Sequence, residues 1–289
     1  MRPEDRKELD ELLGCKPTIY HVGVSGGKDS GALFLWMLKE SGIPHEQIII
    51  TFADTGNEHE YTYEQIRKMN EIFPIETLQP VDAFDGLVRR KGLFPTRKRR
   101  FCTEFLKIRP AQDKLLELQQ AGYNVVSVSG VRADESEDRK DLQEWDYSGT
   151  LLCEQWRPLI KWTIEDVFAI HRKYGLPLNP LYALGAERVG CFPCINSRKS
   201  EMRLITLNFP DRIDSIRQLE EELGDASFFH RNTVPERFRT KQITTKDGET
   251  MMVASIDDVT RWSLTGKRAQ GSYLDDPPEP RSCNSGFCE

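Results

Sequence analysis

The sequence predicts an α/β fold in which a doubly wound, mostly parallel sheet precedes a smaller, mainly helical C-terminal region. An apolar strand over about 19–24 runs into a glycine turn and then into a helical pattern from Asp29 to about Ser41. Residues 48–52 form an unbroken β-branched run, typical of a strand buried on both faces. A predicted helix over 60–73 and a short strand over 75–78 continue the alternation, which favours ligands at the carboxyl ends of parallel strands.

The later elements are predicted from the same periodic patterns, with less regularity. Residues 80–100 and 141–154 carry no sustained pattern, so we expect loops there. Thr163 is expected to cap a helix that runs to about Tyr174, and His171 on that helix is expected to be a packed or surface residue rather than a catalyst. The other predictions are helices over 1–17, 111–120, 200–225 and 257–262, strands over 123–129 and 156–160, and a hairpin within 240–254.

The composition is that of a globular protein. A chain of 289 residues, 38% hydrophobic and 30% charged, suits one α/β domain with an appendage, and we expect a nucleotide-binding domain over 1–199 and a C-terminal extension over 200–289. No apolar run reaches the length of a membrane span, and no apolar signal region follows the N-terminus, so a cytoplasmic protein without membrane contact is expected. The net charge of −6 argues against indiscriminate nucleic-acid binding but allows a local basic patch.

The segment Ser25–Ser30, of sequence Ser-Gly-Gly-Lys-Asp-Ser, lies between the first predicted strand and its helix. Glycines let the backbone turn tightly and approach a ligand, and the first helical turn offers unpaired N–H groups and the positive end of the helix dipole. Such a turn binds phosphate. It is not a Walker A loop, which needs four residues between its first glycine and the Gly-Lys pair.

Ser25–Ser30 resembles the PP-loop of the N-type ATP pyrophosphatases, a superfamily that includes sulfonucleotide reductases, the small subunit of ATP sulfurylase and tRNA thiolation enzymes. Asp54-Thr55-Gly56, the Gly130–Ser136 segment and the Pro180–Cys194 segment are similar to later motifs of its phosphoadenosine phosphosulfate (PAPS) reductase-like branch. The resemblance covers about residues 17–200 and implies an adenine nucleotide alpha hydrolase-like fold. For Asp54-Thr55-Gly56 and Gly130–Ser136, the alternative is an ordinary turn or surface loop.

The resemblance also implies roles for single residues. The loop would cradle pyrophosphate while ATP is cut between its α and β phosphates, with Mg²⁺ offsetting charge on the leaving group. Catalytic roles fall on Lys28, Asp29 and Arg132, the last of which is expected to meet phosphate or sulfate. The implied nucleotide-binding residues are Ser25, Gly26, Gly27, Lys28, Asp29, Ser30, Asp54, Thr55, Gly56, Gly130 and Arg132.

Seven cysteines in a reducing compartment are better interpreted as metal ligands, redox groups or buried thiols than as disulfides. The Cys191-x-x-Cys194 spacing lets one turn present two thiolates to one metal. In cluster-bearing sulfonucleotide reductases, a Cys-Cys pair at the position of Cys102 and a later Cys-x-x-Cys hold a 4Fe–4S cluster. The resemblance therefore implies such a cluster, with zinc or buried structural thiols as alternatives.

This chain departs from that pattern because Phe101 occupies the place of one cluster cysteine. Three ligands remain, whereas a cluster or a zinc ion takes four. Cys288 or Cys283 of the terminal segment would supply the fourth if the tail folds back. Alternatively, one iron stays open, as in some tRNA-thiolating relatives.

A dense basic stretch precedes Cys102 in this otherwise acidic chain. The stretch from Arg89 to Arg100 holds seven cations, and we expect it to bind an anion such as sulfate, phosphate or a nucleic-acid backbone, although a charge run is often only a solvated face. Its cations are Arg89, Arg90, Lys91, Arg97, Lys98, Arg99 and Arg100.

Three functions are compatible with these features. The first is an ATP pyrophosphatase that adenylates an acceptor for sulfur transfer, with nucleic acid as acceptor as in DNA phosphorothioation, a sulfur donor such as a cysteine desulfurase, and a homo-oligomer or larger complex as its assembly. The second is a reductase of PAPS or adenylyl sulfate that uses a C-terminal cysteine and thioredoxin, but in such reductases the Gly-Gly-Lys-Asp core is usually lost. The third is a non-catalytic nucleotide-binding subunit.

Overall fold

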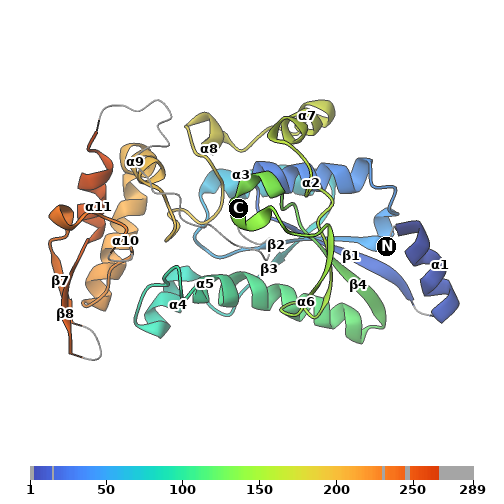
Figure 1. The fold of residues 1–289 in the computed structure, drawn as a ribbon, viewed down its shortest axis with the longest axis horizontal. Coiled ribbons are helices and arrows are strands. Elements are labelled where there is room, and N and C mark those ends of the chain that lie inside the picture. Colours follow the sequence, from blue (N-terminus) through green and yellow to red (C-terminus); the bar gives the residue numbers. More distant parts are fainter. Residues whose placement is uncertain (1–2, 15, 230–231, 245–247, 267–289) are drawn as a thin grey trace.

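The computed structural model describes residues 3–14, 16–229, 232–244 and 248–266. Its centre is a six-stranded sheet with the order β3-β2-β1-β4-β6-β5, in which the first five strands of that order are parallel and only β5 is antiparallel (Figure 1). The predicted doubly wound, mostly parallel α/β fold is therefore confirmed. The strands are β1 (Lys16–Val24), β2 (Ile48–Ala53), β3 (Ile75–Leu78), β4 (Tyr123–Val128), β5 (Trp145–Ser148) and β6 (Cys153–Trp156).

Helices cover both faces of the sheet, with α2, α3 and α7 on one side and α4, α5 and α6 on the other (Figure 1). None of the helices within the described ranges is long and apolar enough to cross a membrane. The helices of this part are α1 (Pro3–Leu13), α2 (Lys28–Lys39), α3 (Glu60–Ile72), α4 (Phe84–Lys91), α5 (Phe101–Thr103), the π-helical η2 (Glu104–Ile108), α6 (Arg109–Gln120), α7 (Ile164–Tyr174) and α8 (Pro180–Ala183), with short 3-10 turns η1 (His45–Gln47), η3 (Ala133–Glu135) and η4 (Glu137–Arg139).

The C-terminal part packs against one end of the sheet (Figure 1). One hydrophobic cluster joins Phe84, Leu87 and Val88 of α4 to Met202 and Trp262 of this part. Burial of these apolar side chains is the main force that holds the two parts together. Its elements are α9 (Lys199–Asn208), α10 (Pro210–Leu223), η5 (Glu236–Phe238), the hairpin β7 (Lys241–Thr244) and β8 (Thr250–Val253), and α11 (Ile256–Ser263).

Two predicted loops were wrong. Residues 80–100 contain α4, because its buried residues Phe84, Leu87 and Val88 form a narrow apolar stripe that the surrounding charges conceal in the sequence. Residues 141–154 contain β5 and the start of β6, whose residues Trp145 and Trp156 stack across the strands with ring centroids 4.9 Å apart. The strand predicted over 156–160 ends at Trp156 instead.

Candidate nucleotide site and cysteine pocket

The turn Ser25–Ser30 joins β1 to α2, as predicted. Gly26 adopts φ +76°, and a Cβ atom there would lie only 3.0 Å from Cγ2 of Thr62 on α3, so the turn needs glycine for both conformation and space. The Ser25 backbone N–H donates to Oγ of Ser30 at 3.2 Å, and the two hydroxyl oxygens lie 3.1 Å apart. The two serines therefore close the turn on itself.

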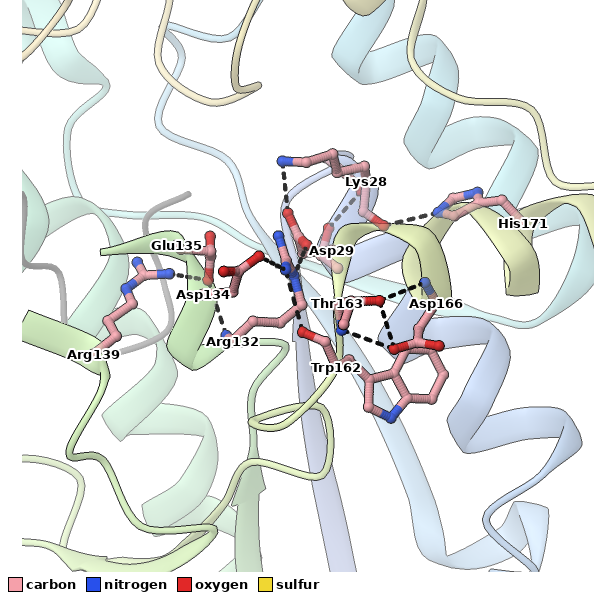
Figure 2. Close-up of polar contacts among 12 residues, drawn as sticks. Lys28, Asp29, Arg132, Asp134, Glu135, Arg139, Trp162, Thr163, Asp166 and His171 are labelled. Atoms are coloured by element: carbon pink, nitrogen blue, oxygen red, sulfur yellow. Dashed lines mark hydrogen bonds and ion pairs between the residues drawn. The ribbon is translucent and has the colours of Figure 1, made fainter. Parts of the chain in front are cut away.

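Asp29, in the first turn of α2, holds two cations (Figure 2). Its Oδ1 accepts from Nε of Arg132 at 2.5 Å, and its Oδ2 lies 2.8 Å from Nζ of Lys28. The side chains of Asp29 and Arg132 are 1% and 4% exposed. Such a buried pair is strongly held, because removing either partner leaves a charge without compensation in a low-dielectric interior.

Arg132 also connects the segments on either side of it. Its backbone N–H donates to Glu135 at 2.9 Å, and its guanidinium donates to the Trp162 carbonyl at 3.3 Å, while Glu135 pairs with Arg139. Just after Trp162, Thr163 and Asp166 form the predicted capping arrangement at the start of α7. The ion pairs of this network join three cations, Lys28, Arg132 and Arg139, to three carboxylates, Asp29, Asp134 and Glu135. Figure 2 shows a fourth carboxylate, that of Asp166, which accepts from Thr163.

The segment from α7 to α8 contacts the backbone of the loop directly. The Lys28 backbone N–H donates to the Tyr182 hydroxyl at 2.9 Å, and Lys28 Nζ lies 5.4 Å from the centre of the Tyr182 ring. Nδ2 of Asn179 donates to the Gly26 carbonyl at 3.4 Å. Nε2 of His171 lies 2.8 Å from the Lys28 carbonyl oxygen. The conformation of the loop therefore depends on residues about 150 positions later in the chain.

A cavity opens at the carboxyl ends of β1, β2 and β4, where the fold class predicts a ligand. Ser25, Ser30 and Gly130 of the predicted nucleotide-binding set line it, together with Glu58, Lys107, Arg139 and Gly190. Asp54, Thr55 and Gly56 are not among the residues that line this cavity, and their hydrogen bonds stabilise their own turn. Asp54 accepts from the Tyr63 hydroxyl at 2.8 Å and from the Gly56 N–H at 2.9 Å, and Thr55 donates to Glu58.

A second cavity, here called the cysteine pocket, contains Cys191 and Cys194. It shares Lys107 and Gly190 with the first cavity, so these two residues separate the two spaces. Helix α9 supplies one wall. The full lining is Arg100, Lys107, Ala186, Arg188, Gly190, Cys191, Phe192, Cys194, Asn196, Ser197, Glu201, Leu204 and Ile205.

The turn that carries Cys191 is attached to the segment after β2. Phe192 N–H donates to the Asn57 carbonyl at 2.6 Å, and Nδ2 of Asn57 donates to the Pro193 carbonyl at 3.0 Å. Cys191 itself forms an isolated backbone bridge with Glu58. The segment after β2 thus sets the position of the Cys191-x-x-Cys194 turn beside the first cavity.

Lys107 on the π-helical turn η2 is a buried cation that lines both cavities and is only 8% exposed. Burial raises the pKa of the Glu58 carboxyl, and the charge of Lys107 opposes that shift. Burial likewise raises the pKa of the Cys191 thiol, again opposed by Lys107. Lys107 therefore offsets negative charge on both sides of the boundary between the cavities.

Cys102 and Cys194 both lie close enough to Cys191 for their charges to raise the pKa of its thiol. Thiolates are the donors that iron–sulfur clusters and zinc prefer. Yet the described ranges contain no group of three or more cysteine, histidine or acidic side chains arranged to hold a metal ion. The candidate fourth ligands Cys283 and Cys288 lie outside these ranges. The predicted cluster is therefore not confirmed.

The profile of the phosphoadenosine phosphosulfate reductase domain family matches residues 20–197, well over half of the chain. The chain belongs to this family. An uncharacterized 37.8 kDa protein of Escherichia phage 186 is 31% identical over 97% of this chain and all of its own length. Adenosine 5′-phosphosulfate reductase of Bacillus cereus is 32% identical over 50% of this chain, and the match spans 61% of that reductase. Phosphoadenylyl-sulfate reductase of Candida auris gives a TM-score of 0.47 at 18% identity, covering 67% of this chain and 90% of that one.

The predicted basic stretch is divided between a helix and a loop in this PAPS reductase-domain protein. Around the Phe105 ring lie Nζ of Lys91 at 4.4 Å, Cζ of Arg109 at 3.8 Å and Cζ of Arg90 at 5.5 Å from its centroid. Some of the charge is already paired, as in the contact between Arg89 and Glu222. Lys98 and Arg99 are exposed, and Arg100 lines the cysteine pocket. The basic surface therefore reaches the edge of that pocket.

Several site residues escaped sequence reasoning. Lys107 and Glu58 belong to no pattern that separates them from other charged residues, and only the fold brings them together. The wall from α9 was unforeseeable because its contribution depends on how the C-terminal part packs. The hydrogen bond from Lys28 to Tyr182 also depends on tertiary structure, although the segment holding Tyr182 was singled out by its resemblance to a family motif.

We predict a strong energetic coupling between Arg132 and Asp29. Arg132→Met should lower the free energy of unfolding by about 3 kcal/mol, the low end of the range for a broken buried pair, because Lys28 remains beside Asp29. In a urea-denaturation double-mutant cycle, the Asp29→Leu/Arg132→Met variant should be more stable than the sum of the single costs implies. Strictly additive costs would contradict the assignment of this pair as one unit.

Proposed function

We propose that this protein is a PP-loop ATP pyrophosphatase that activates an acceptor for sulfur transfer. An acceptor oxygen attacks the α phosphorus of ATP, the bond to the β-phosphate oxygen breaks, and pyrophosphate leaves. The observation that carries this proposal is the intact Ser25–Ser30 loop, which retains both glycines, Lys28 and Asp29 and whose Ser25 and Ser30 line the first cavity. A loop that served only a nucleotide without a β,γ-pyrophosphate would have no need of this complete set.

The roles of the loop residues follow from their chemistry. The N–H groups at the start of α2 and the hydroxyls of Ser25 and Ser30 are donors for pyrophosphate oxygens. Lys28 would move from Asp29 towards the phosphates, while Arg132 keeps Asp29 in place. Because Lys28, Arg132 and Arg139 are already paired with carboxylates, a triphosphate would require an added cation, which supports the expectation of Mg²⁺.

The neighbouring cysteine pocket suits the second half of such a reaction. An adenylated acceptor held at Lys107 and Gly190 would lie between the two cavities, with its leaving AMP in the first. A sulfur nucleophile arriving from the cysteine side would attack the activated centre and displace AMP. We propose that a separate protein, such as a cysteine desulfurase, supplies this sulfur as a persulfide. A thiol reductant would then cleave the disulfide that joins the acceptor to the carrier cysteine and release the thiolated acceptor.

The exposed basic surface supports a nucleic-acid acceptor, as in DNA phosphorothioation. Lys98 and Arg99 are open to solvent, and Lys91 and Arg109 lie against the Phe105 ring on the neighbouring helices. Lysine and arginine contacts with backbone phosphates supply sequence-independent affinity for nucleic acid. The acidic remainder of the chain would confine that contact to one face.

We retain an iron–sulfur cluster, with zinc as the alternative, as a proposal for the cysteine pocket. Cys102, Cys191 and Cys194 provide the donor chemistry, and Cys288 or Cys283 would complete the set. Because the described thiols do not by themselves form a ligand group, no step of the proposed reaction passes through this metal.

A second candidate function is reduction of adenylyl sulfate or PAPS. It is favoured by the 32% identity to the Bacillus cereus reductase over half of this chain. In that reaction, Cys288 or Cys283 would attack the sulfate sulfur, and thioredoxin would then release sulfite. We place this candidate second because the Gly-Gly-Lys-Asp core, which such reductases usually lose, is intact here.

Lys28→Ala should reduce the release of pyrophosphate from ATP by at least about 100-fold, because a positioned charge on the departing pyrophosphate is lost. The measurement is a pyrophosphate assay with ATP, Mg²⁺ and acceptor. Lys39→Ala provides the control, since Lys39 is exposed at the far end of the same helix. Unchanged release from the Lys28 variant would refute the loop assignment.

Cys191→Ser should remove bound metal from the protein purified without oxygen. We expect iron and sulfide in the unmodified protein and their loss from this variant, as measured by metal analysis and visible absorbance. Cys153→Ser, in strand β6 outside the cysteine pocket, should keep its iron. A Cys191→Ser protein that keeps its iron would exclude Cys191 as a ligand, and zinc in place of iron would select the alternative metal.

Lys98→Glu/Arg99→Glu should weaken DNA binding and lower the slope of log affinity against log salt by about 2, because two phosphate contacts are lost. Fluorescence anisotropy with a labelled duplex over a salt series measures both quantities. Lys39→Glu/Lys68→Glu makes the same charge change at two other exposed sites. Equal effects of the two pairs would mean that net charge, rather than this surface, governs binding.

A further inference from the structure

His171 lies against the backbone of the Ser25–Ser30 turn and is only 4% exposed. Nε2 lies 2.8 Å from the carbonyl oxygen of Lys28, and Nδ1 lies 3.0 Å from the carbonyl oxygen of Leu176. Figure 2 shows the ring reaching from α7 to the start of α2. The contact falls on the backbone of Lys28, so it acts on the loop whatever the side chain of Lys28 does.

Both ring nitrogens face carbonyl oxygens, which only accept, and a neutral ring carries one N–H. We assign that proton to Nε2, at the shorter of the two contacts, so that the ring donates to the Lys28 carbonyl. The carbonyl belongs to the peptide plane that also carries the N–H of Asp29. Fixing the carbonyl therefore fixes the direction of that N–H, one of the donors in the first helical turn that lack an intrahelical acceptor. His171 thus adds to the hydrogen bonding within α2, which begins at Lys28, in holding the orientation of a group that the proposed function assigns to phosphate.

Gly31 makes this contact sterically possible. A Cβ atom at position 31 would lie 2.7 Å from Cε1 and 3.0 Å from Nε2 of His171. The ring is held by carbonyl contacts at both nitrogens, so it cannot move away from such a methyl group without weakening one of them. The position of the His171 ring on α7 therefore requires glycine at position 31 of α2.

We propose that His171 is a positioning residue for nucleotide binding, which sets the Lys28–Asp29 peptide in the orientation that presents its N–H to the phosphates. The inference deepens the proposed function and rests on it. His171 acts through Lys28 rather than through contact with the nucleotide. Loss of the hydrogen bond to Lys28 should raise the dissociation constant for ATP more than loss of the contact with Leu176.

Two nearly isosteric variants separate the two ring contacts. The amide nitrogen of Gln reaches the place of Nε2, so His171→Gln keeps a donor for Lys28. The amide nitrogen of Asn reaches the place of Nδ1, so His171→Asn keeps a contact with the Leu176 carbonyl and loses the donor for Lys28. We expect His171→Asn to bind Mg²⁺–ATP roughly tenfold more weakly, and His171→Gln to bind it about as well as the unmodified protein.

Calorimetry gives the dissociation constants, and thermal unfolding of each variant reports the structural cost, which should be similar for the two substitutions. Arg172→Gln, at the next and exposed position of α7, is the control. Equal ATP affinities of the Gln and Asn variants would overturn the positioning role while leaving the proposed function intact. Failure of the unmodified protein to bind Mg²⁺–ATP would overturn the proposed function itself, and this inference with it.

Gly31→Ala disturbs the same contact from α2. It replaces His171→Asn as the test variant if His171→Asn does not fold. The added methyl group should displace the ring and raise the dissociation constant for Mg²⁺–ATP by a similar factor. Combined with His171→Asn, it should add little further loss, because the contact is already absent. Full additivity of the two effects would contradict the inference.

Discussion

The buried pair of Asp29 and Arg132 is the interaction on which the geometry of the site depends. It joins the first turn of α2 to the segment after β4, and Arg132 extends the connection to the Trp162 carbonyl before α7. Taking both charges out of water is costly, so the pair persists only because the surrounding backbone supplies further hydrogen bonds. The three segments that frame the nucleotide loop are thereby held in one arrangement.

The same frame places two cavities side by side. Parallel strands bring the ends of β1, β2 and β4 to one edge, and the turn carrying Cys191 is attached there through Asn57. Lys107 lies at the boundary, where it opposes the effect of burial on two acidic groups. Helix α9 closes the cysteine side, so the C-terminal part contributes to the site as well as to the hydrophobic core.

Sequence reasoning succeeded where the determinants are local. The turn Ser25–Ser30 and the cap at Thr163 were both predictable, because their glycine, serine and threonine residues act on the neighbouring backbone. It failed at α4 and β5, which have few apolar residues and are stabilised by packing against residues distant in the sequence. His171 was expected to be only packed or exposed, since nothing in its neighbourhood along the chain reveals a contact with Lys28. Long-range contacts of this kind hold most residues of the site in place.

Product analysis of the purified, anaerobic protein tests the central claim most directly. The protein is incubated in parallel with Mg²⁺–ATP plus DNA and with phosphoadenylyl sulfate plus reduced thioredoxin, and the nucleotides, pyrophosphate and sulfite are quantified. We expect pyrophosphate from ATP, an equal amount of adenylyl groups recovered on the DNA or as AMP, and no sulfite from phosphoadenylyl sulfate. Sulfite formation without cleavage of ATP would contradict it and would identify a reductase that has kept a complete PP-loop.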